Sequence, residues 1–357
     1  MKQEKSRPVV VLDNEGPCTK NDNAFELFVA ILMLFGFSEK AAAATFRNLS
    51  VIDDIWGDFK KMARLDPTYS AGHTLKVILP FIRALGTKLE WLYEFSKSNI
   101  LVVPKIDLVI PDLQNRGYEI FQISTSYSFF IEAFCDLVGL DFQQAYCTRI
   151  DPKLYNGVST TTRQKNKLLK FLEELSQMPP VKYDHLTGEI AENHQKNYDR
   201  ITGFIWYTVR NMEVGRLMKE VHPVGQFQKY EALKDIAEIA DQPLRRIMYV
   251  GDSQTDVEVA RYLLNKGLVM MFNGKGHQVC ELSDIMYIGQ DARAITEVAD
   301  VFDKSGREGA ISFCAPSRQA HFGGKLHVVT SENVKRLEAR SENMRKKFRG
   351  VHIGSLT

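Results

Sequence analysis

The chain has few cysteines, and their spacing excludes two kinds of stabilisation. The 357 residues include only five, an odd number without any CxxC pair: Cys18, Cys135, Cys147, Cys280 and Cys314. Such a set provides neither a disulfide framework nor a structural zinc site. The eight histidines are also scattered and lack the spacing of metal ligands. A reducing, cytoplasmic compartment is therefore expected.

The chain also lacks long apolar runs and an excess of either charge. Its longest apolar stretch, Leu27 to Phe37, is shorter than the roughly 20 residues that span a bilayer. No basic leader with an apolar core and a cleavage site precedes it. The formal net charge is +2, which gives no reason to expect nucleic acid or an acidic membrane as a partner. Oligomeric state and protein partners stay open.

The length predicts two domains, or one domain with large insertions. The chain is organised around residues 9–16, VVVLDNEG. Four apolar residues in a row predict a strand buried on both faces of a sheet, and α/β proteins bind ligands beyond the carboxyl ends of such strands. Asp13 stands at that end, Glu15 follows two residues later, and Gly16 permits a sharp turn. Alone, this acidic pair is also typical of a helix cap or a solvated turn.

Helix-forming sequence follows the first strand. Helices are expected over 24–35, over 38–46 and over 70–96, where Pro80 should kink or split the last one. We therefore predict an all-helical insertion over 23–99.

Strand chemistry returns after residue 100. A short helix is predicted at 111–115 with Pro111 in its first turn, then a strand over 118–123 that ends at Ser124-Thr125-Ser126, and a helix over 129–138. After residue 226, helices over 227–239 and 255–264 alternate with three strands, at 246–250, 268–272 and 285–288. The alternation predicts an α/β fold with a parallel sheet, built from 1–22, 100–150 and 223–302.

Two further segments lie outside this pattern. Residues 151–222 are expected to be a second, mostly helical insertion, with helices over 165–177 and about 199–220 and with Trp206 and Tyr207 as core residues. The tail, 303–357, should be less regular and contain an exposed helix over 331–349, rich in Lys and Arg. A solvated face or a contact with a partner or polyanion would explain that charge.

Polar residues at strand ends and helix starts suit phosphoryl chemistry. An aspartate such as Asp13 can attack phosphorus and form an aspartyl-phosphate. Asp252 and Asp256, four residues apart at a helix start, could hold Mg²⁺ together with Asp13. Ser124 and the N–H groups after it suit phosphate oxygens, and Lys229 could neutralise phosphate charge. Glu15 could act as general acid and base.

Three segments with these residues resemble the haloacid dehalogenase-like (HAD) superfamily of phosphohydrolases. VVVLDNEG is similar to its first motif, GYEIFQISTSYSFFIEAFCDLVGL to its second, and QKYEALKDIAEIADQPLRRIMYVGDSQTD to its third and fourth. The resemblance covers about 9–22, 100–150 and 225–300. The spacing from Lys229 to Gly251 is similar to that of the phosphoserine-phosphatase branch, and LVMMFNG followed by DARAITEVAD is similar to archaeal members.

The resemblance implies a Rossmann-like core with a helical cap and Mg²⁺ as cofactor. It implies Asp13 as the nucleophile, Glu15 as acid and base in a position that is usually Asp, and Asp13, Glu15, Asp252 and Asp256 around the metal. Ser124, or Thr125 beside it, and Lys229 would bind phosphate. The implied activity is hydrolysis of a small-molecule phosphomonoester. Two alternatives stay open: phosphoryl transfer to a small alcohol, and a catalytically weak subunit that binds a protein partner.

Overall fold

The computed structural model describes residues 7–184 and 186–349, and it is built on one eight-stranded sheet. The strand order is β3-β2-β1-β4-β5-β6-β8-β7, in which the first six are parallel and the last two antiparallel. The strands are β1 Val9–Leu12, β2 Glu119–Tyr127, β3 Ala145–Thr148, β4 Ile247–Gly251, β5 Leu268–Phe272, β6 Ile285–Ile288, β7 Ser317–Gln319 and β8 Lys325–Val328. This confirms the predicted α/β class.

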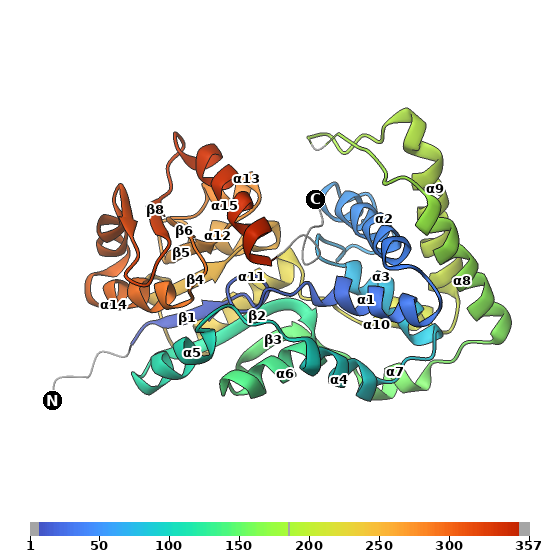
Figure 1. Cartoon of the computed structure of the whole chain (residues 1–357), viewed down its shortest axis with the longest axis horizontal. Helices are drawn as coiled ribbons and strands as arrows, with labels where there is room; N and C mark the ends of the chain where they lie inside the picture. Colours follow the sequence, from blue (N-terminus) through green and yellow to red (C-terminus); the bar gives the residue numbers. More distant parts are fainter. Residues whose placement is uncertain (1–6, 185, 350–357) are drawn as a thin grey trace.

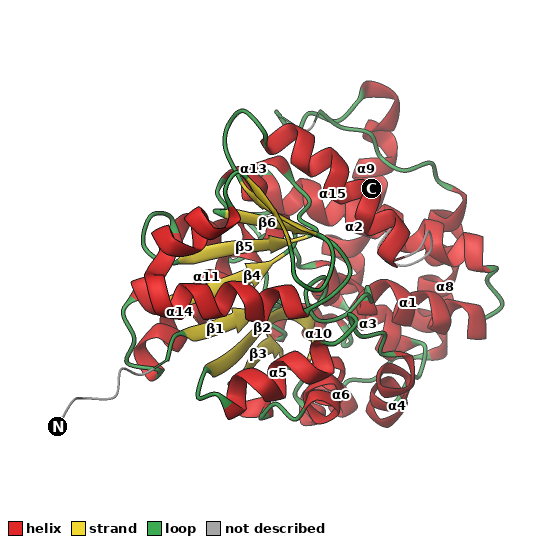
Figure 2. Ribbon diagram, turned by 60° about the vertical axis from the view of Figure 1, so that its left-hand side comes forward, coloured by secondary structure: helices red, strands yellow, loops and turns green. Residues whose placement is uncertain are grey.

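Helices cover both faces of the sheet (Figure 2). Because side chains alternate along a strand, Val10 and Leu12 of β1 belong to one hydrophobic cluster while Val9 and Val11 belong to the other. The first cluster is covered by α5 Ile106–Asn115, α6 Ser128–Val138 and α14 Arg293–Cys314. The second is covered by α11 Gln226–Ile239, α12 Val257–Leu263, α13 His277–Glu281 and α15 Val334–Arg349. Burial on both faces explains the uninterrupted apolar sequence of β1.

The two helical insertions pack together beside the core, on the right in Figure 1. The first contains α1 Asn23–Leu34, α2 Glu39–Asp58, α3 Thr74–Ala84 and α4 Leu89–Asn99. The second contains α7 Pro152–Gly157, α8 Thr162–Gln177, α9 Gln195–Gly203 and α10 Gly215–Glu220. Helix α8 packs against α2, and α10 packs against α3. The segments expected as a cap and a separate insertion therefore form one helical layer.

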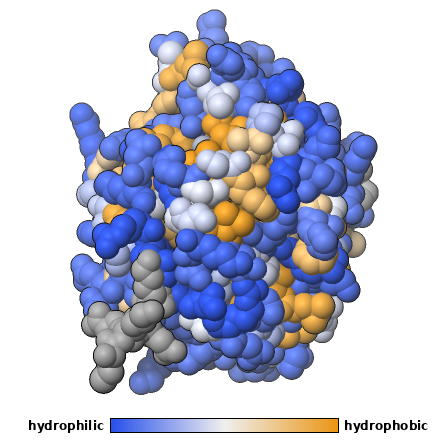
Figure 3. All heavy atoms as spheres, turned by 90° about the vertical axis from the view of Figure 1, so that its left-hand side faces the viewer, coloured by the Kyte–Doolittle hydropathy of each residue, from blue (hydrophilic) through white to orange (hydrophobic). Residues whose placement is uncertain are grey.

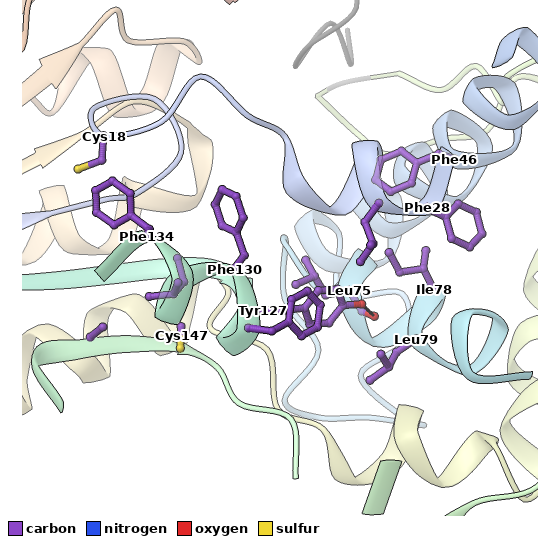
Figure 4. Close-up of a cluster of buried hydrophobic side chains, with 14 of the residues drawn as sticks. Cys18, Phe28, Phe46, Leu75, Ile78, Leu79, Tyr127, Phe130, Phe134 and Cys147 are labelled. Atoms are coloured by element: carbon purple, nitrogen blue, oxygen red, sulfur yellow. Dashed lines mark hydrogen bonds between the residues drawn. The ribbon is translucent and has the colours of Figure 1, made fainter. Parts of the chain in front are cut away.

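The helical layer and the core share apolar contacts. Phe130 and Phe134 of α6 belong to the same hydrophobic cluster as Leu75 and Ile78 of α3, and Figure 4 shows Tyr127 at the junction. The Tyr127 hydroxyl donates a 2.6 Å hydrogen bond to the carbonyl oxygen of Leu75. The end of β2, which borders the site described below, is thus tied directly to the helical layer.

Both prolines that were expected to mark helix breaks or starts lie inside helices. Pro80 is within α3, whose residues are nearly all buried, and the chain instead breaks after that helix, where Gly86 has φ +91°. Pro111 is the sixth residue of α5. That helix begins at Ile106 because Ile106, Val109, Ile110 and Leu113 form one buried face. Tertiary burial overrides the local preference of proline in both cases.

The helix expected over 199–220 is interrupted. After α9 the chain forms a π-helical segment, Phe204–Thr208, and a 3-10 turn before α10 begins. Trp206 is buried as predicted, but the core assignment of Tyr207 is wrong, since its side chain is 66% exposed. The π-helical winding shifts neighbouring side chains off the regular 3.6-residue period that the prediction assumed.

The residues after 303 are more regular than expected. Helix α14 continues to Cys314 through a kink at Gly306, and β7 and β8 extend the sheet beyond β6. Helix α15 matches the predicted basic helix, whereas residues 350–357 lie outside the described part of the chain. Figure 3 shows the end of the molecule that lies farthest from the helical layer. This surface is largely hydrophilic, with scattered apolar patches. Among the described residues, no helix combines the length and apolar character needed to cross a membrane.

Candidate active site

Two aspartates meet at the carboxyl edge of the sheet, where the strand order changes direction. Strands β1 and β4 pair in parallel with Leu12 opposite Val250, so Asp13 and Asp252 follow neighbouring strand ends. The Asp13 N–H donates to the Val250 carbonyl at 2.9 Å. Since β2 and β3 continue to one side of β1 and β4 to β6 to the other, this is the switch point where α/β sheets bind ligands.

Lys229 forms ion pairs with an aspartate of each of the two segments, Asp13 after β1 and Asp256 after β4. It lies on α11, is 1% exposed, and places Nζ 2.6 Å from Asp13 Oδ2 and 2.7 Å from Asp256 Oδ1. Burial alone would lower the pKa of this ammonium, but Asp13 and Asp256 outweigh it and raise the pKa. Lys229 is therefore a permanent cation beside Asp13.

Both carboxylate oxygens of Asp256 are occupied by hydrogen bonds. Oδ1 also accepts the Tyr249 hydroxyl at 2.6 Å, and Oδ2 accepts the N–H groups of Asp252 and Ser253 at 2.9 and 3.0 Å. Burial opposes ionisation of Asp256, but Lys229 and these donors lower its pKa. Asp256 thus holds the loop after β4 and the lysine in place.

The acidic residues of the two strand ends fit a hard divalent cation. Asp13, Asp252 and Asp256 each offer a carboxylate oxygen, and these oxygens lie within 4.8 Å of one another. Oxygen donors of this kind suit Mg²⁺, which usually keeps several waters besides one or two carboxylates. Since Asp256 already accepts from four groups, Asp13 and Asp252 are the members best placed to hold the ion. Glu15 does not belong to this group of oxygens.

Glu15 lines a cavity together with Asp13 and Asp252. Its Oε1 accepts the Ser126 hydroxyl at 2.7 Å and the Asn23 N–H at 2.9 Å. Burial, with a smaller contribution from Asp22, raises its pKa to about 7, while Arg349 opposes the shift. A carboxyl group with such a pKa can both donate and accept a proton near neutral pH.

Ser124 and Thr125 line the cavity, but their local structure differs from the expectation. Strand β2 continues to Tyr127 and α6 begins only at Ser128, so Ser124 is in the strand and not at a helix N-terminus. The Ser124 hydroxyl accepts the Ser126 N–H at 3.1 Å. The strand is longer than predicted because its pairing with β3 continues, after an irregularity, to Tyr127 and Thr148.

The cavity has a volume of about 330 Å³ and contains residues that the sequence did not single out. The predicted Asp13, Glu15, Ser124, Thr125 and Asp252 line it, together with Asp22, Asp54, Ser126, Lys275, Arg345 and Arg349. A neighbouring cavity of about 440 Å³ shares part of this lining and extends along α2. Asp22 is the N-cap of α1, where its side chain accepts the Phe25 N–H, and Ser126 is the last residue of the Ser124-Thr125-Ser126 triplet.

The least expected members are the two arginines of α15. Arg345 Nη1 forms an ion pair with Asp252 Oδ2, and Arg349 Nε donates to the Lys20 carbonyl at 2.7 Å. In Figure 1, α15 runs along the core and ends at the junction with the helical layer. The expectation that this helix is a solvated face or an external contact is wrong for its last turn. No motif could have shown this, because only the path of the chain brings it to the strand ends.

Comparisons with known proteins give the fold. No protein-family model matches the sequence, and neither does any curated protein. The structure is similar to that of the gene product AF1437 from Archaeoglobus fulgidus, with a TM-score of 0.76 and 21% identity over 97% of this chain and 98% of that one.

Two phosphatase structures are more distant. Phosphoserine phosphatase in its apo form matches with a TM-score of 0.41 and 16% identity over 82% of this chain and 98% of its own. A phospho-aspartyl intermediate analogue of phosphoserine phosphatase matches with a TM-score of 0.42 and 16% identity over 82% of this chain and 99% of that one. At this similarity neither adds to an argument about activity. The site therefore has to be interpreted from its own geometry.

Proposed function

We propose that this protein is a Mg²⁺-dependent phosphatase of the HAD superfamily that hydrolyses a small-molecule phosphomonoester. The observation that carries the proposal is the meeting of Asp13, Lys229 and Asp252 at the edge of the sheet, with Glu15 across the same cavity. This arrangement provides a carboxyl nucleophile, a buried cation beside it and a metal site within one pocket. Burial raises the pKa of Asp13, and the charge of Lys229 opposes that shift. The superfamily assignment also draws on the motif resemblance of the sequence.

The proposed reaction has two steps, formation of an aspartyl-phosphate on Asp13 and its hydrolysis. In the first, an Asp13 carboxylate oxygen bonds to phosphorus, the ester P–O bond breaks, and Glu15 gives its proton to the departing oxygen to make the alcohol. In the second, water bonds to phosphorus, Glu15 takes a proton from that water, and the bond to Asp13 breaks to release phosphate. Glu15 then has its original proton.

The other groups hold phosphate and reduce charge repulsion. Lys229 stands beside Asp13, while Ser124 and Thr125 offer hydroxyl groups on the cavity wall. Mg²⁺ held by Asp13 and Asp252, with Asp256 behind them, would supply positive charge against the phosphate oxygens. Lys229 and the ion would both reduce the repulsion between Asp13 and the phosphate.

Within the superfamily the protein belongs to the phosphoserine-phosphatase-like branch, of the archaeal type, and works in the cytoplasm. The spacing from Lys229 to Gly251 and the LVMMFNG segment support the first two assignments. The five cysteines are buried and free, which is consistent with a reducing compartment. The modest cavity volume supports a small substrate.

The test is phosphate release from a panel of phosphomonoesters, with and without Mg²⁺. The panel includes an aryl phosphate and phosphoserine, and Asp13→Asn is the matched control because it keeps shape and removes the nucleophile. Turnover that needs Mg²⁺ and disappears in Asp13→Asn is expected. Retained turnover in that variant would contradict the mechanism.

Two other outcomes would identify the alternatives. If added glycerol yields glycerol phosphate at the expense of free phosphate, the enzyme is a phosphotransferase that uses the same residues. If no ester turns over and Mg²⁺ with a phosphate mimic leaves the melting temperature unchanged, the enzyme proposal fails. Stable co-purification with a protein partner would then indicate a binding subunit.

A further inference from the structure

The last turn of α15 reaches the acid that is best placed to hold a metal. Arg345 Nη1 contacts Asp252 Oδ2 and lies 3.4 Å from the Asp252 carbonyl oxygen and 3.2 Å from that of Asn273. The two charged side chains are 12% and 3% exposed. Arg349 Nη1 lies 3.8 Å from the same carboxylate oxygen. A guanidinium therefore occupies one side of a carboxylate that a cation needs.

The position of α15 is fixed by contacts on both sides of the site. Glu338 accepts the Gly276 N–H at 3.1 Å, next to the loop after β5. At its other end Arg349 donates to the carbonyl oxygens of Lys20 and Asn21, in the segment that leads from the core into the helical layer. The helix is therefore built into the site, and Arg345 is presented to Asp252 by a packed element.

We propose that Arg345 competes with Mg²⁺ for Asp252 and transfers to substrate phosphate when the ion binds. This inference rests on the proposed function. Two cations that share one nearly buried carboxylate would repel each other at close range, so each would weaken the binding of the other. Arg345 holds Asp252 in place until the ion arrives.

A phosphate group would remove the competition. Arg345 lines the same cavity as Asp13 and Ser124, where the phosphate is proposed to bind. Within the described residues, Nη1 is the nitrogen of Arg345 that is hydrogen-bonded, which leaves the N–H groups of Nε and Nη2 for an anion. A guanidinium that leaves Asp252 for phosphate couples the two ligands, so phosphate should strengthen Mg²⁺ binding, and Mg²⁺ should strengthen phosphate binding equally.

The test measures Mg²⁺ binding by titration calorimetry, without substrate and without turnover. Arg345→Gln removes the competing charge, and we expect it to lower the dissociation constant of Mg²⁺ about tenfold. Arg340→Gln is the matched control, since it removes the same charge from an exposed position of α15. Arg345→Lys keeps a cation on a shorter side chain and should lie between the wild type and Arg345→Gln. Circular dichroism verifies that each variant is folded.

A second titration adds inorganic phosphate at saturating concentration. Phosphate should tighten Mg²⁺ binding by a clearly larger factor in the wild type than in Arg345→Gln. Equal Mg²⁺ constants in the wild type, Arg340→Gln and a folded Arg345→Gln would overturn the proposal, as would absence of Mg²⁺ binding in all of them. A competitive pattern without turnover of any ester would instead support this inference and refute only the proposed activity.

Discussion

Lys229 Nζ lies 2.6 Å from Asp13 Oδ2, although 216 residues separate the two in sequence. The lysine comes from α11 and the aspartate from the end of β1, and both side chains are at most 5% exposed. The buried lysine and the buried carboxylates of Asp13 and Asp256 each stabilise the charged form of the other. This reciprocal dependence makes Lys229 the most sensitive point of the site.

Replacing Lys229 by Met should destabilise the fold as well as abolish turnover. It would leave Asp13 and Asp256 buried without a counter-charge, and breaking such a group costs about 3–5 kcal/mol. Urea unfolding followed by circular dichroism would measure the loss. Lys234→Met removes an exposed lysine of the same helix and should have little effect. Equal unfolding midpoints for the two variants would refute the proposed role.

Glu15→Gln should separate the two chemical steps with an aryl phosphate. The aryl oxide leaves without much help from an acid, so Asp13 can still become phosphorylated. Hydrolysis of the intermediate needs the base and should slow by about 10²-fold or more. Rapid-mixing absorbance should show a burst of about one equivalent of aryl oxide per enzyme. A slow reaction without a burst would contradict this prediction, because it would show that the loss of Glu15 makes the first step rate-limiting.

The stability of the wild type relative to Glu15→Gln should depend on pH. The folded-state pKa of Glu15 is about 7 against an ordinary 4.5, because burial disfavours its ionised form. Protonated Glu15 therefore contributes its full stabilisation of the fold below about pH 4.5, and this contribution is lost as the pH rises through about 7. Between pH 5 and 8 the wild type should lose about 2 kcal/mol more than Glu15→Gln. If the free energies of unfolding of the two proteins, measured with urea, changed equally with pH, the pKa of Glu15 would not be raised in the folded state.

Gly16→Ala should disturb Asp252 through a direct collision. Gly16 has φ +114°, and an added Cβ would lie 2.3 Å from Asp252 Cγ. Gly36 is the matched control, because it also has a positive φ, +88°, but an added Cβ there meets nothing within 4 Å. Strain in the backbone alone costs about 1–2 kcal/mol.

Gly16→Ala should therefore lose more stability than Gly36→Ala, and it alone should weaken Mg²⁺ binding. Urea unfolding and titration calorimetry on both variants would measure the two effects. Similar losses, with Mg²⁺ affinity intact in both, would show that Asp252 can yield without consequence.

The sequence was sufficient where the signal is local. The run before Asp13 predicted a strand buried on both faces, and the apolar patterns predicted β4, β5 and β6 within a few residues. The helices α1, α6, α8, α11, α12 and α15 were also predicted within a few residues, whereas α2 continues 12 residues past its predicted end at 46 and α14 was not predicted. Short motifs selected Asp13, Ser124 and Asp252 at strand ends, because the carboxyl ends of parallel strands meet at one edge. The structure brings these residues together as that rule predicts.

Tertiary structure decided the features that depend on distant partners. The strand β2 is longer than its sequence suggests because β3 continues to pair with it, and Pro80 is tolerated because α3 is buried on nearly all sides. The arrival of Arg345 at Asp252 depends on β7 and β8 extending the sheet and on the path of α15 back over the strand ends. A charge pattern shows that a helix is basic, but only the packed fold determines which carboxylate its arginines reach.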